Sequence, residues 1–274
     1  MVYNSMDYSA KDTLLDVIRK ESGDFFSIVD DPRNWNVQTR CEEWEVRDIV
    51  GHMIDVTEGY LTRWDMARKG EEAPAAWGLV GMDKRLNEHA QAFRSLPREE
   101  AIARLKSDYN KMFAIFSDLD ADAWNNFMVA HPYMGPLPPF FYPAFQVIDY
   151  GIHTWDMRWG LGDKNGKLDE RTAGVLVPHM FIVMQYTVDQ ESARGLDTVF
   201  GIKIDGEWGG QWRVTIKDGT FKAEPGDDLS GTSALFHFKD ASDFVLTVYQ
   251  RFPGGETSGD PEIINRIRHL FFKI

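Results

Sequence analysis

The sequence predicts an α+β protein, with an N-terminal four-helix bundle over residues 1–190 and a small α/β domain over residues 191–274. Three observations support this fold class. The chain has 274 residues, about twice the usual length of one domain. Apolar residues recur at helical spacing in the first part of the chain. After Arg194 the pattern changes to the alternation that is typical of strands.

Four amphipathic stripes predict the helices of the bundle, because their apolar residues recur every three or four positions. The stripes contain Leu14, Ile18, Phe25 and Val29; Val46, Ile49, Met53, Val56, Tyr60 and Trp64; Leu105, Tyr109, Met112, Phe116 and Leu119; and Phe141, Phe145, Ile148, Ile152, Trp155 and Trp159. Glycine and proline end helices or set turns. Such residues separate the stripes at positions 31–32, 70–74, 97 and 135–139.

The C-terminal part carries signals for strands, turns and two helices. Expected strands lie over residues 200–205, 211–221 and 233–238, and expected helices begin at Asp240 and Asp260, the second of them ending at Phe272. Asp218-Gly219 is a strong hairpin turn signal. This region is therefore expected to form a small sheet covered by helices.

Composition and charge narrow the classes of function. The net charge of -13 disfavours nucleic acid and anionic membrane surfaces, since both attract clustered Lys and Arg. A single cysteine, Cys41, allows no internal disulfide, which fits a reducing compartment. The first residues have no basic start and no apolar run, and no run of about eighteen apolar residues occurs. We expect a cytoplasmic protein.

One pattern of residues carries chemistry. Asp149 and His153 are four positions apart on the fourth helix, so they share a helix face. His52 lies on the side of the second helix that also carries Ile49 and Val56, which directs it into the bundle. Ionisable groups in an apolar interior are costly unless they are paired or coordinated. Two histidines and a carboxylate are a common zinc set with an open fourth position. A plain ion pair between Asp149 and His153 is the alternative.

Two signatures resemble a known family. Residues 39–52 contain Cys-x-x-Trp-x-Val-x-Asp-x-x-x-His, and residues 148–156 contain Asp-x-x-x-His-x-Trp-Asp. Both are similar to signatures of the mycothiol-dependent maleylpyruvate isomerase family, a branch of the DinB-like metal-binding four-helix bundles. The resemblance implies that His52, Asp149 and His153 bind zinc, or another divalent metal, and that a low-molecular-weight thiol such as mycothiol reacts there. The family usually has Glu where this chain has Asp149. The shorter side chain reaches less far, so weaker binding or no metal are the alternatives.

The end of the chain resembles the sterol carrier protein type 2-like domain that closes these isomerases, through residues 241–245 and 258–271. The family links an arginine of this domain to activity, and Arg251 is the nearest match, although Gln250 replaces a glycine. The alternative is a solvated arginine at a helix end. Asp156 is the other catalytic candidate, because a ligating histidine needs a partner for its second ring nitrogen. A structural pairing role is its alternative.

Two further residues are expected to play ordinary roles. His131, in a loop before Tyr133, is expected to face solvent, and Cys41 is expected to be a packed thiol. The loop over residues 131–139 is apolar and rich in proline, which suits a wall of a substrate pocket.

The predicted function is metal-activated thiol chemistry on a small electrophilic substrate. A thiol at the open zinc position loses its proton at neutral pH and adds to an unsaturated carbon. Expulsion of the thiol after rotation is cis-trans isomerisation, and its retention is S-transfer. Two alternatives stay open, namely a non-catalytic binding protein for an apolar molecule through the sterol-carrier-like domain, and zinc-dependent hydrolysis. The sequence specifies neither the substrate, the thiol nor the oligomeric state.

Overall fold

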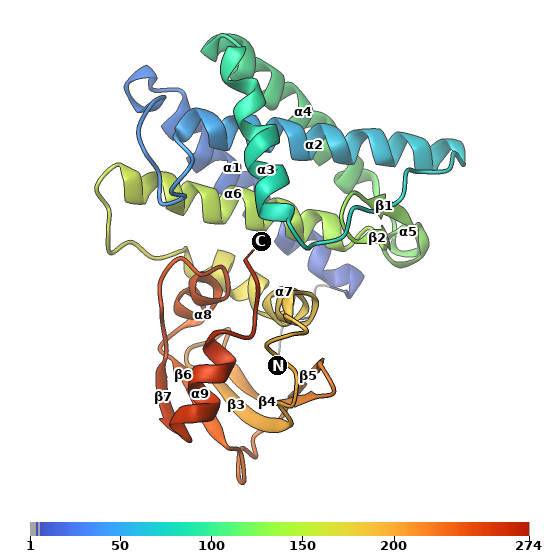
Figure 1. Cartoon of the computed structure of the whole chain (residues 1–274). Helices are drawn as coiled ribbons and strands as arrows, with labels where there is room; N and C mark the ends of the chain where they lie inside the picture. The colour runs from blue at the N-terminus through green and yellow to red at the C-terminus, as the bar shows by residue number, and fades with distance from the viewer. Residues whose placement is uncertain (1–3, 5, 274) are drawn as a thin grey trace. The chain divides into compact units, whose positions relative to one another are not determined.

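The computed structural model describes residue 4 and residues 6–273, which form two compact units divided between Gly166 and Lys167 (Figure 1). The first unit is mainly helical and the second holds the larger sheet, which confirms the predicted α+β class. The sequence predicts no leader at the N-terminus. Residues 1–3 and 5 of that stretch lie outside the described residues. In the part of the chain that is described, no helix combines the length and apolarity needed to span a membrane.

The helical unit contains the four predicted helices. Its elements are α1 (Lys11–Val29), α2 (Val46–Lys69), α3 (Met82–Ala92), α4 (Arg98–Asp118), α5 (Ala121–Asn126), the short antiparallel pair β1 (Val129–His131) and β2 (Gly135–Leu137), and α6 (Phe141–Gly160). Helices α1, α2, α4 and α6 correspond to the four stripes, and α1 packs along α6 while α2 packs on α3 and α4. Gly70 ends α2 in the left-handed conformation, with φ 69°, which glycine adopts without a steric penalty.

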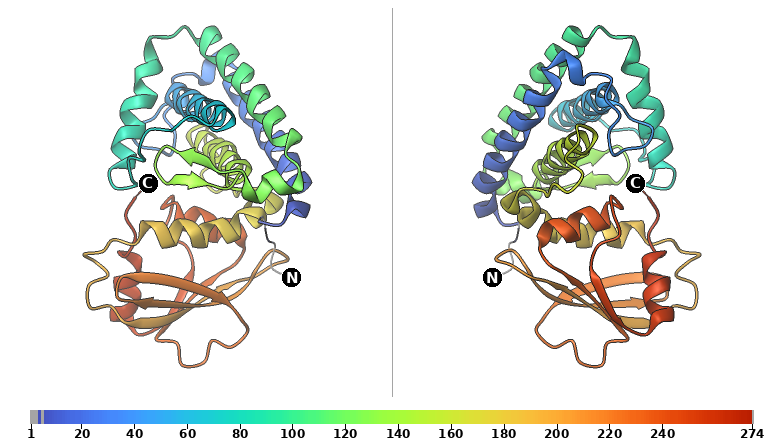
Figure 2. Two further views of the ribbon diagram at one scale, coloured as in Figure 1. Left: turned by 90° about the vertical axis from the view of Figure 1, so that its right-hand side faces the viewer. Right: turned by 90° about the vertical axis from the view of Figure 1, so that its left-hand side faces the viewer.

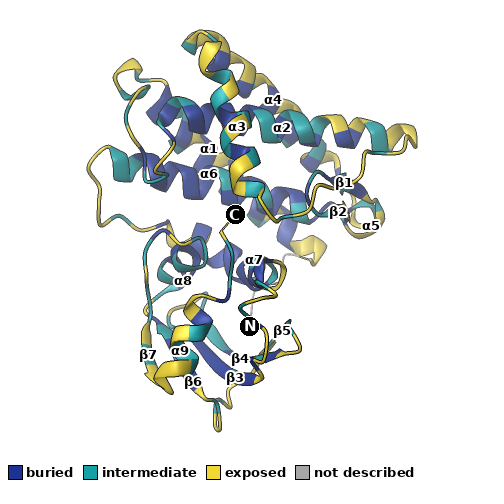
Figure 3. Ribbon diagram, viewed as in Figure 1, coloured by how far each residue is buried: buried dark blue, intermediate teal, exposed yellow. Residues whose placement is uncertain are grey.

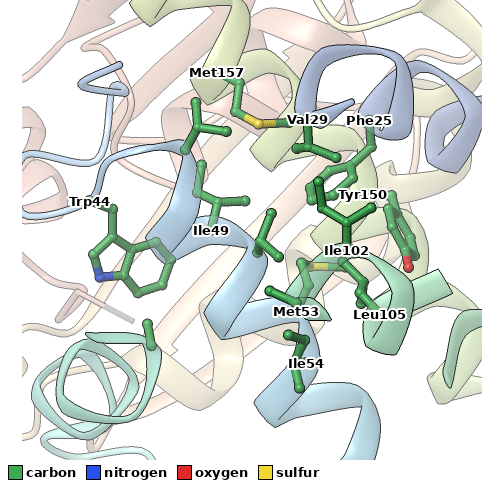
Figure 4. Packing of buried hydrophobic residues seen from close by; sticks show 14 of the residues in the cluster. Phe25, Val29, Trp44, Ile49, Met53, Ile54, Ile102, Leu105, Tyr150 and Met157 are labelled. Carbon is green, nitrogen blue, oxygen red and sulfur yellow. The ribbon is translucent and has the colours of Figure 1, made fainter. Parts of the chain in front are cut away.

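Buried apolar side chains from these helices form the core of the unit (Figure 4). Phe25 and Tyr150 meet edge to face, with ring centroids 5.3 Å apart, and Ile49 and Met53 are fully buried beside them. Each such side chain contributes about 1.5–3 kcal/mol to the free energy of unfolding. Helix α6 is buried along most of its length (Figure 3), so a polar residue on its inner face is held inside the unit.

The second unit is a five-stranded sheet with three helices. Its elements are α7 (Glu170–Thr187), β3 (Thr198–Ile204), β4 (Gly210–Lys217), β5 (Thr220–Pro225), β6 (Ala234–Phe238), α8 (Ala241–Val248), β7 (Glu256–Gly259) and α9 (Pro261–Arg268). The strand order is β5-β4-β3-β6-β7, with β3 and β6 parallel and every other pair antiparallel. Figure 2 shows α7 and α8 over one face of this sheet.

Helix α7 belongs with the sheet, which shifts the division of the chain. The sequence places the boundary after residue 190, whereas the compact units divide between Gly166 and Lys167. The physical reason is aromatic packing, because the ring of Phe181 on α7 lies 4.8 Å from that of Trp212 on β4 and 5.3 Å from that of Phe244 on α8. The apolar face of α7 is therefore part of the second core.

Candidate metal centre

The N-terminus of α2 is fixed by a capping box that also sets the position of His52. The backbone N–H of Glu45 donates to the Asp48 carboxylate at 2.9 Å, and the Glu45 side chain caps the helix in return. Asp48 is fully buried and receives two hydrogen bonds from Arg94, at 2.7 and 2.8 Å. His52 follows one turn later on the inner side of the helix and is 4% exposed. Asp48 and His52 of the signature over residues 39–52 therefore lie in the first two turns of α2, where Asp48 caps the helix and His52 points inward.

His52, Asp149 and His153 come together as the sequence predicts. Each residue offers one ligand atom, and these atoms all lie within 4.8 Å of one another. His52 Nε2 is 3.8 Å from Asp149 Oδ1, and the rings of His52 and His153 are 5.0 Å apart at 80°. Two atoms bound to one tetrahedral zinc at bond lengths of about 2.0 Å lie roughly 3.3 Å apart. The shorter Asp149 side chain therefore reaches the group.

The hydrogen bonding of these three residues suits a cation. Among the described residues, His52 Nδ1 and Asp149 Oδ2 are buried atoms with no hydrogen-bond partner. The 3.8 Å separation of His52 Nε2 and Asp149 Oδ1 exceeds hydrogen-bond length. Burying a polar atom such as His52 Nδ1 or Asp149 Oδ2 without a hydrogen-bond partner costs on the order of 2–7 kcal/mol. A divalent metal would offset that cost, so the residues fit such an ion.

Asp156 and Cys41 stand behind His153. Asp156 is fully buried, and its Oδ2 lies 3.0 Å from His153 Nδ1 and accepts from Cys41 Sγ at 3.3 Å. This contact occupies Nδ1 of His153 and leaves Nε2 on the side of His52. Cys41, His153 and Asp156 are a second group whose ligand atoms fall within 4.8 Å. They share His153 with the first group, so the two groups form one centre.

Trp44 forms a wall of the centre. Its ring lies 4.9 Å from that of His52 and 5.6 Å from that of His153. Its Nε1 donates to Asn87 Oδ1 at 3.0 Å, which ties the wall to α3. The segment before Trp44 crosses Gly160 at the end of α6 so closely that a Cβ there would overlap the carbonyl of Gln38.

His131 is buried, which corrects the expectation that it faces solvent. It ends strand β1 and is 5% exposed. Its Nδ1 accepts hydrogen bonds from the backbone N–H groups of Tyr133 and Met134, both at 3.2 Å, and its Nε2 lies 3.3 Å from the hydroxyl of Tyr60. Burial lowers the pKa of His131 to about 4. The β1–β2 turn folds back over its own histidine, and this local pairing carries no clear sequence signal.

Arg251 lies in the second unit, whereas the candidate ligands lie in the first. It follows Gln250, whose φ of 54° is left-handed, and its backbone N–H closes the end of α8 on Leu246 O at 2.8 Å. Arg251 is 9% exposed, and Nη1 donates to Tyr249 O at 3.1 Å. The alternative of a solvated arginine is therefore wrong, while a catalytic role for Arg251 stays a prediction.

Sequence reasoning missed Arg63. It is 8% exposed and lies on α2, eleven positions after His52. Eleven residues are close to three helical turns, so the two residues share a face of α2. That spacing is the signal that would have found it.

A helical unit with two histidines and a carboxylate on facing helices, followed by a mixed-sheet unit, defines a class of two-domain proteins with a candidate metal centre. The family profile described as the mycothiol maleylpyruvate isomerase N-terminal domain matches residues 15–158, more than half of the chain. The chain belongs to this family. No curated protein sequence matches it.

Two solved structures with TM-scores of 0.59 share this fold. The structure of the mycothiol-dependent maleylpyruvate isomerase has a TM-score of 0.59 and 15% sequence identity, covering 90% of this chain and 92% of that one. A histidine-to-alanine variant of that isomerase has a TM-score of 0.59 and 14% identity over the same shares. The colibactin self-resistance protein ClbS in complex with double-stranded DNA has a TM-score of 0.48 and 13% identity, covering 56% of this chain and 96% of that one.

Proposed function

We propose that this protein is a zinc-dependent enzyme that uses a low-molecular-weight thiol, of the mycothiol kind, to isomerise a small electrophilic substrate. The observation that carries the proposal is the convergence of His52, Asp149 and His153, together with the buried His52 Nδ1 and Asp149 Oδ2, which have no hydrogen-bond partner among the described residues. Membership in the isomerase family and the shared fold support the thiol and the reaction class. Zinc bound there would lower the pKa of a thiol at its open position.

The residues of the chain would divide the remaining work. Asp156 holds Nδ1 of His153 and so keeps Nε2 turned toward the ion, and the Cys41 thiol fixes the Asp156 carboxylate in turn. The Trp44 ring covers both histidines and keeps water from that side. Asp149 supplies the only negative charge among the three ligands.

In the proposed reaction the thiolate sulfur adds to one carbon of a conjugated double bond. The electron pair of that bond moves onto the substrate's carbonyl group as an enolate. Rotation about the resulting single bond and expulsion of the sulfur restore the double bond with the other geometry and return the thiolate. S-transfer would follow if the adduct were released intact. Both outcomes need the same site.

Two other candidate functions differ from this proposal in whether they need zinc or a thiol. A carrier of apolar molecules, with its binding site in the second unit, needs no ion at His52. A zinc hydrolase needs the ion but no thiol. The cavity lined by Leu168, Trp208 and Ser242 also has charged walls, including Lys167 and Asp240, which does not favour an apolar cargo.

Zinc content and thermal stability test the proposal. Purified protein should contain close to one zinc per chain, and exhaustive chelation should lower its melting temperature, because an ion that binds only the folded state stabilises it. Activity on a cis-unsaturated keto acid should require both the metal and an added thiol. A melting temperature and a metal content that both survive chelation unchanged would refute the site.

A further inference from the structure

The two candidate histidine ligands differ in how their rings are held. His153 Nδ1 lies 3.0 Å from the buried carboxylate of Asp156, which fixes the orientation of that ring. His52 Nδ1 is buried and has no hydrogen-bond partner among the described residues. A ligating histidine is normally oriented by a hydrogen bond at its second ring nitrogen. The ring of His52 must therefore be oriented in another way.

The indole of Trp44 is the group that lies against His52. The centroids of the two rings are 4.9 Å apart and the ring planes make an angle of 35°, so the rings are closer to parallel than to perpendicular. Trp44 is 8% exposed, and Nε1 is the one polar atom of its side chain. The orientation of the indole, and with it the space in which the His52 ring can turn, therefore depends on the group that binds this N–H.

Asn87 on α3 binds the indole N–H. Its Oδ1 accepts from Trp44 Nε1 at 3.0 Å and from Gln91 Nε2 at 2.8 Å, and its Nδ2 donates to the Glu43 carboxylate. Turning the amide over would place its NH2 group against two other donors. Its three hydrogen bonds therefore keep the Asn87 acceptor directed at Trp44.

Helix α3 crosses α2 (Figure 1), and the two helices are in contact next to His52. A Cβ at Gly51, the residue before His52, would overlap the carbonyl oxygen of Ala90. Ala90 is fully buried, and Asn87 lies about one turn before it on α3. The helix that carries Asn87 is therefore fixed at a constant distance from His52.

We propose that Asn87 is a positioning residue of the metal centre, which acts through the Trp44 indole to orient the ring of His52. The inference rests on the proposed function, because it assumes that His52 Nε2 binds the ion. The indole takes the part at His52 that the Asp156 carboxylate takes at His153. Without the Asn87 acceptor the indole turns, the His52 ring turns with it, and the two histidines no longer present Nε2 to one point.

Zinc affinity and the NMR signals of His52 test the proposal in the full-length protein. In Asn87→Leu the zinc affinity, measured by competition with a chelator, should fall about tenfold, as for other groups that orient a ligating histidine. Signals of the His52 ring are identified by their absence in His52→Ala, and their difference between the parent and Trp44→Leu gives the effect of the indole ring current. In metal-free Asn87→Leu at least half of that difference should be lost.

Gln91→Leu is the matched control. It removes an amide that also bonds to Asn87 but leaves the acceptor of the Trp44 N–H in place. Its zinc affinity should stay within twofold of the parent and its His52 signals should not move. Trp44→Phe keeps an aromatic ring and removes the N–H, so adding Asn87→Leu to it should cause no further loss of zinc affinity. A merely structural Asn87 would cause the same further loss as in the parent.

Unchanged His52 signals in Asn87→Leu would overturn the proposal, and so would equal losses of zinc affinity in Asn87→Leu and Gln91→Leu. If Asn87→Leu does not fold, Trp44→Phe decides, because it should also lose about tenfold in zinc affinity, and an unchanged affinity would overturn the proposal. A parent protein that binds no zinc would refute the proposed function. The His52 signals of the metal-free protein would then decide separately whether Asn87 orients this ring.

Discussion

Two buried histidine environments in the helical unit differ in how their polar atoms are satisfied. At His131 both ring nitrogens have partners, two backbone N–H groups and a tyrosine hydroxyl. At His52 neither nitrogen has a hydrogen-bond partner among the described residues, and Asp149 beside it has none either. Burial alone therefore does not indicate function. Buried polar atoms that have no partner within the protein, such as His52 Nδ1 and Asp149 Oδ2, indicate a place where a ligand binds.

The largest expected effect separates these two histidines directly. His52→Ala removes one of three proposed ligands, so zinc measured by elemental mass spectrometry should fall from near one per chain to near zero. His131→Ala should keep its zinc. It should instead lose about 1–3 kcal/mol of unfolding free energy in urea, because the N–H groups of Tyr133 and Met134 lose their acceptor. Zinc loss in His131→Ala with retention in His52→Ala would reverse the comparison.

Substitution of Asp149 tests whether its negative charge contributes to zinc binding. Asp149→Asn keeps the shape but removes the negative charge among the three ligands, so zinc affinity measured by competition with a chelator should fall tenfold or more. Asp149→Glu should bind within a few-fold of the parent. If Asp149→Asn binds as tightly as the parent, Asp156, which already contacts His153, becomes the better candidate for the third ligand.

The smallest effect concerns pH. Burial lowers the pKa of His131 to about 4, below its usual 6.5, so the folded protein keeps it neutral while the unfolded chain takes up a proton. Stability from this residue is complete above about pH 6.5 and is lost as pH falls toward 4, by at most about 3 kcal/mol. As pH falls from about 6.5 to 4, the urea concentration at the unfolding midpoint should decline less for His131→Gln than for the parent. His179→Gln, in the second unit, should show a similarly reduced decline, because burial also lowers the pKa of His179 to about 4. An identical decline in the parent and His131→Gln would contradict this account.

The helices and the candidate ligands could be predicted because they depend on local patterns. The stripe from Val46 to Trp64 is one amphipathic face, and the spacing of Asp149 and His153 places both on one side of α6. The Asp218-Gly219 turn could also be predicted, because an Asp-Gly pair favours a hairpin turn. The structure confirms it, since both residues have positive φ and lie between β4 and β5.

What the sequence did not reveal depends on contacts between distant segments. The parallel pairing of β3 with β6 joins residues such as Phe200 and Ala234, and nothing in either strand announces its partner. Strand β7 has only four residues, and α9 ends at Arg268 rather than at Phe272. The burial of His131 depends on Tyr60 and on the turn after β1, so its surroundings could not be read from its own position.

The close approach at Gly160 has a consequence for the size of the site. The carbonyl of Gln38 occupies the space where a Cβ of residue 160 would lie. Because Gly160 has no Cβ, the segment that carries Trp44 can pack closely on the end of α6. Adding that methyl group would lift the chain and carry the indole away from His52 and His153. The lack of a side chain at Gly160 therefore determines how close the Trp44 ring lies to the two histidines.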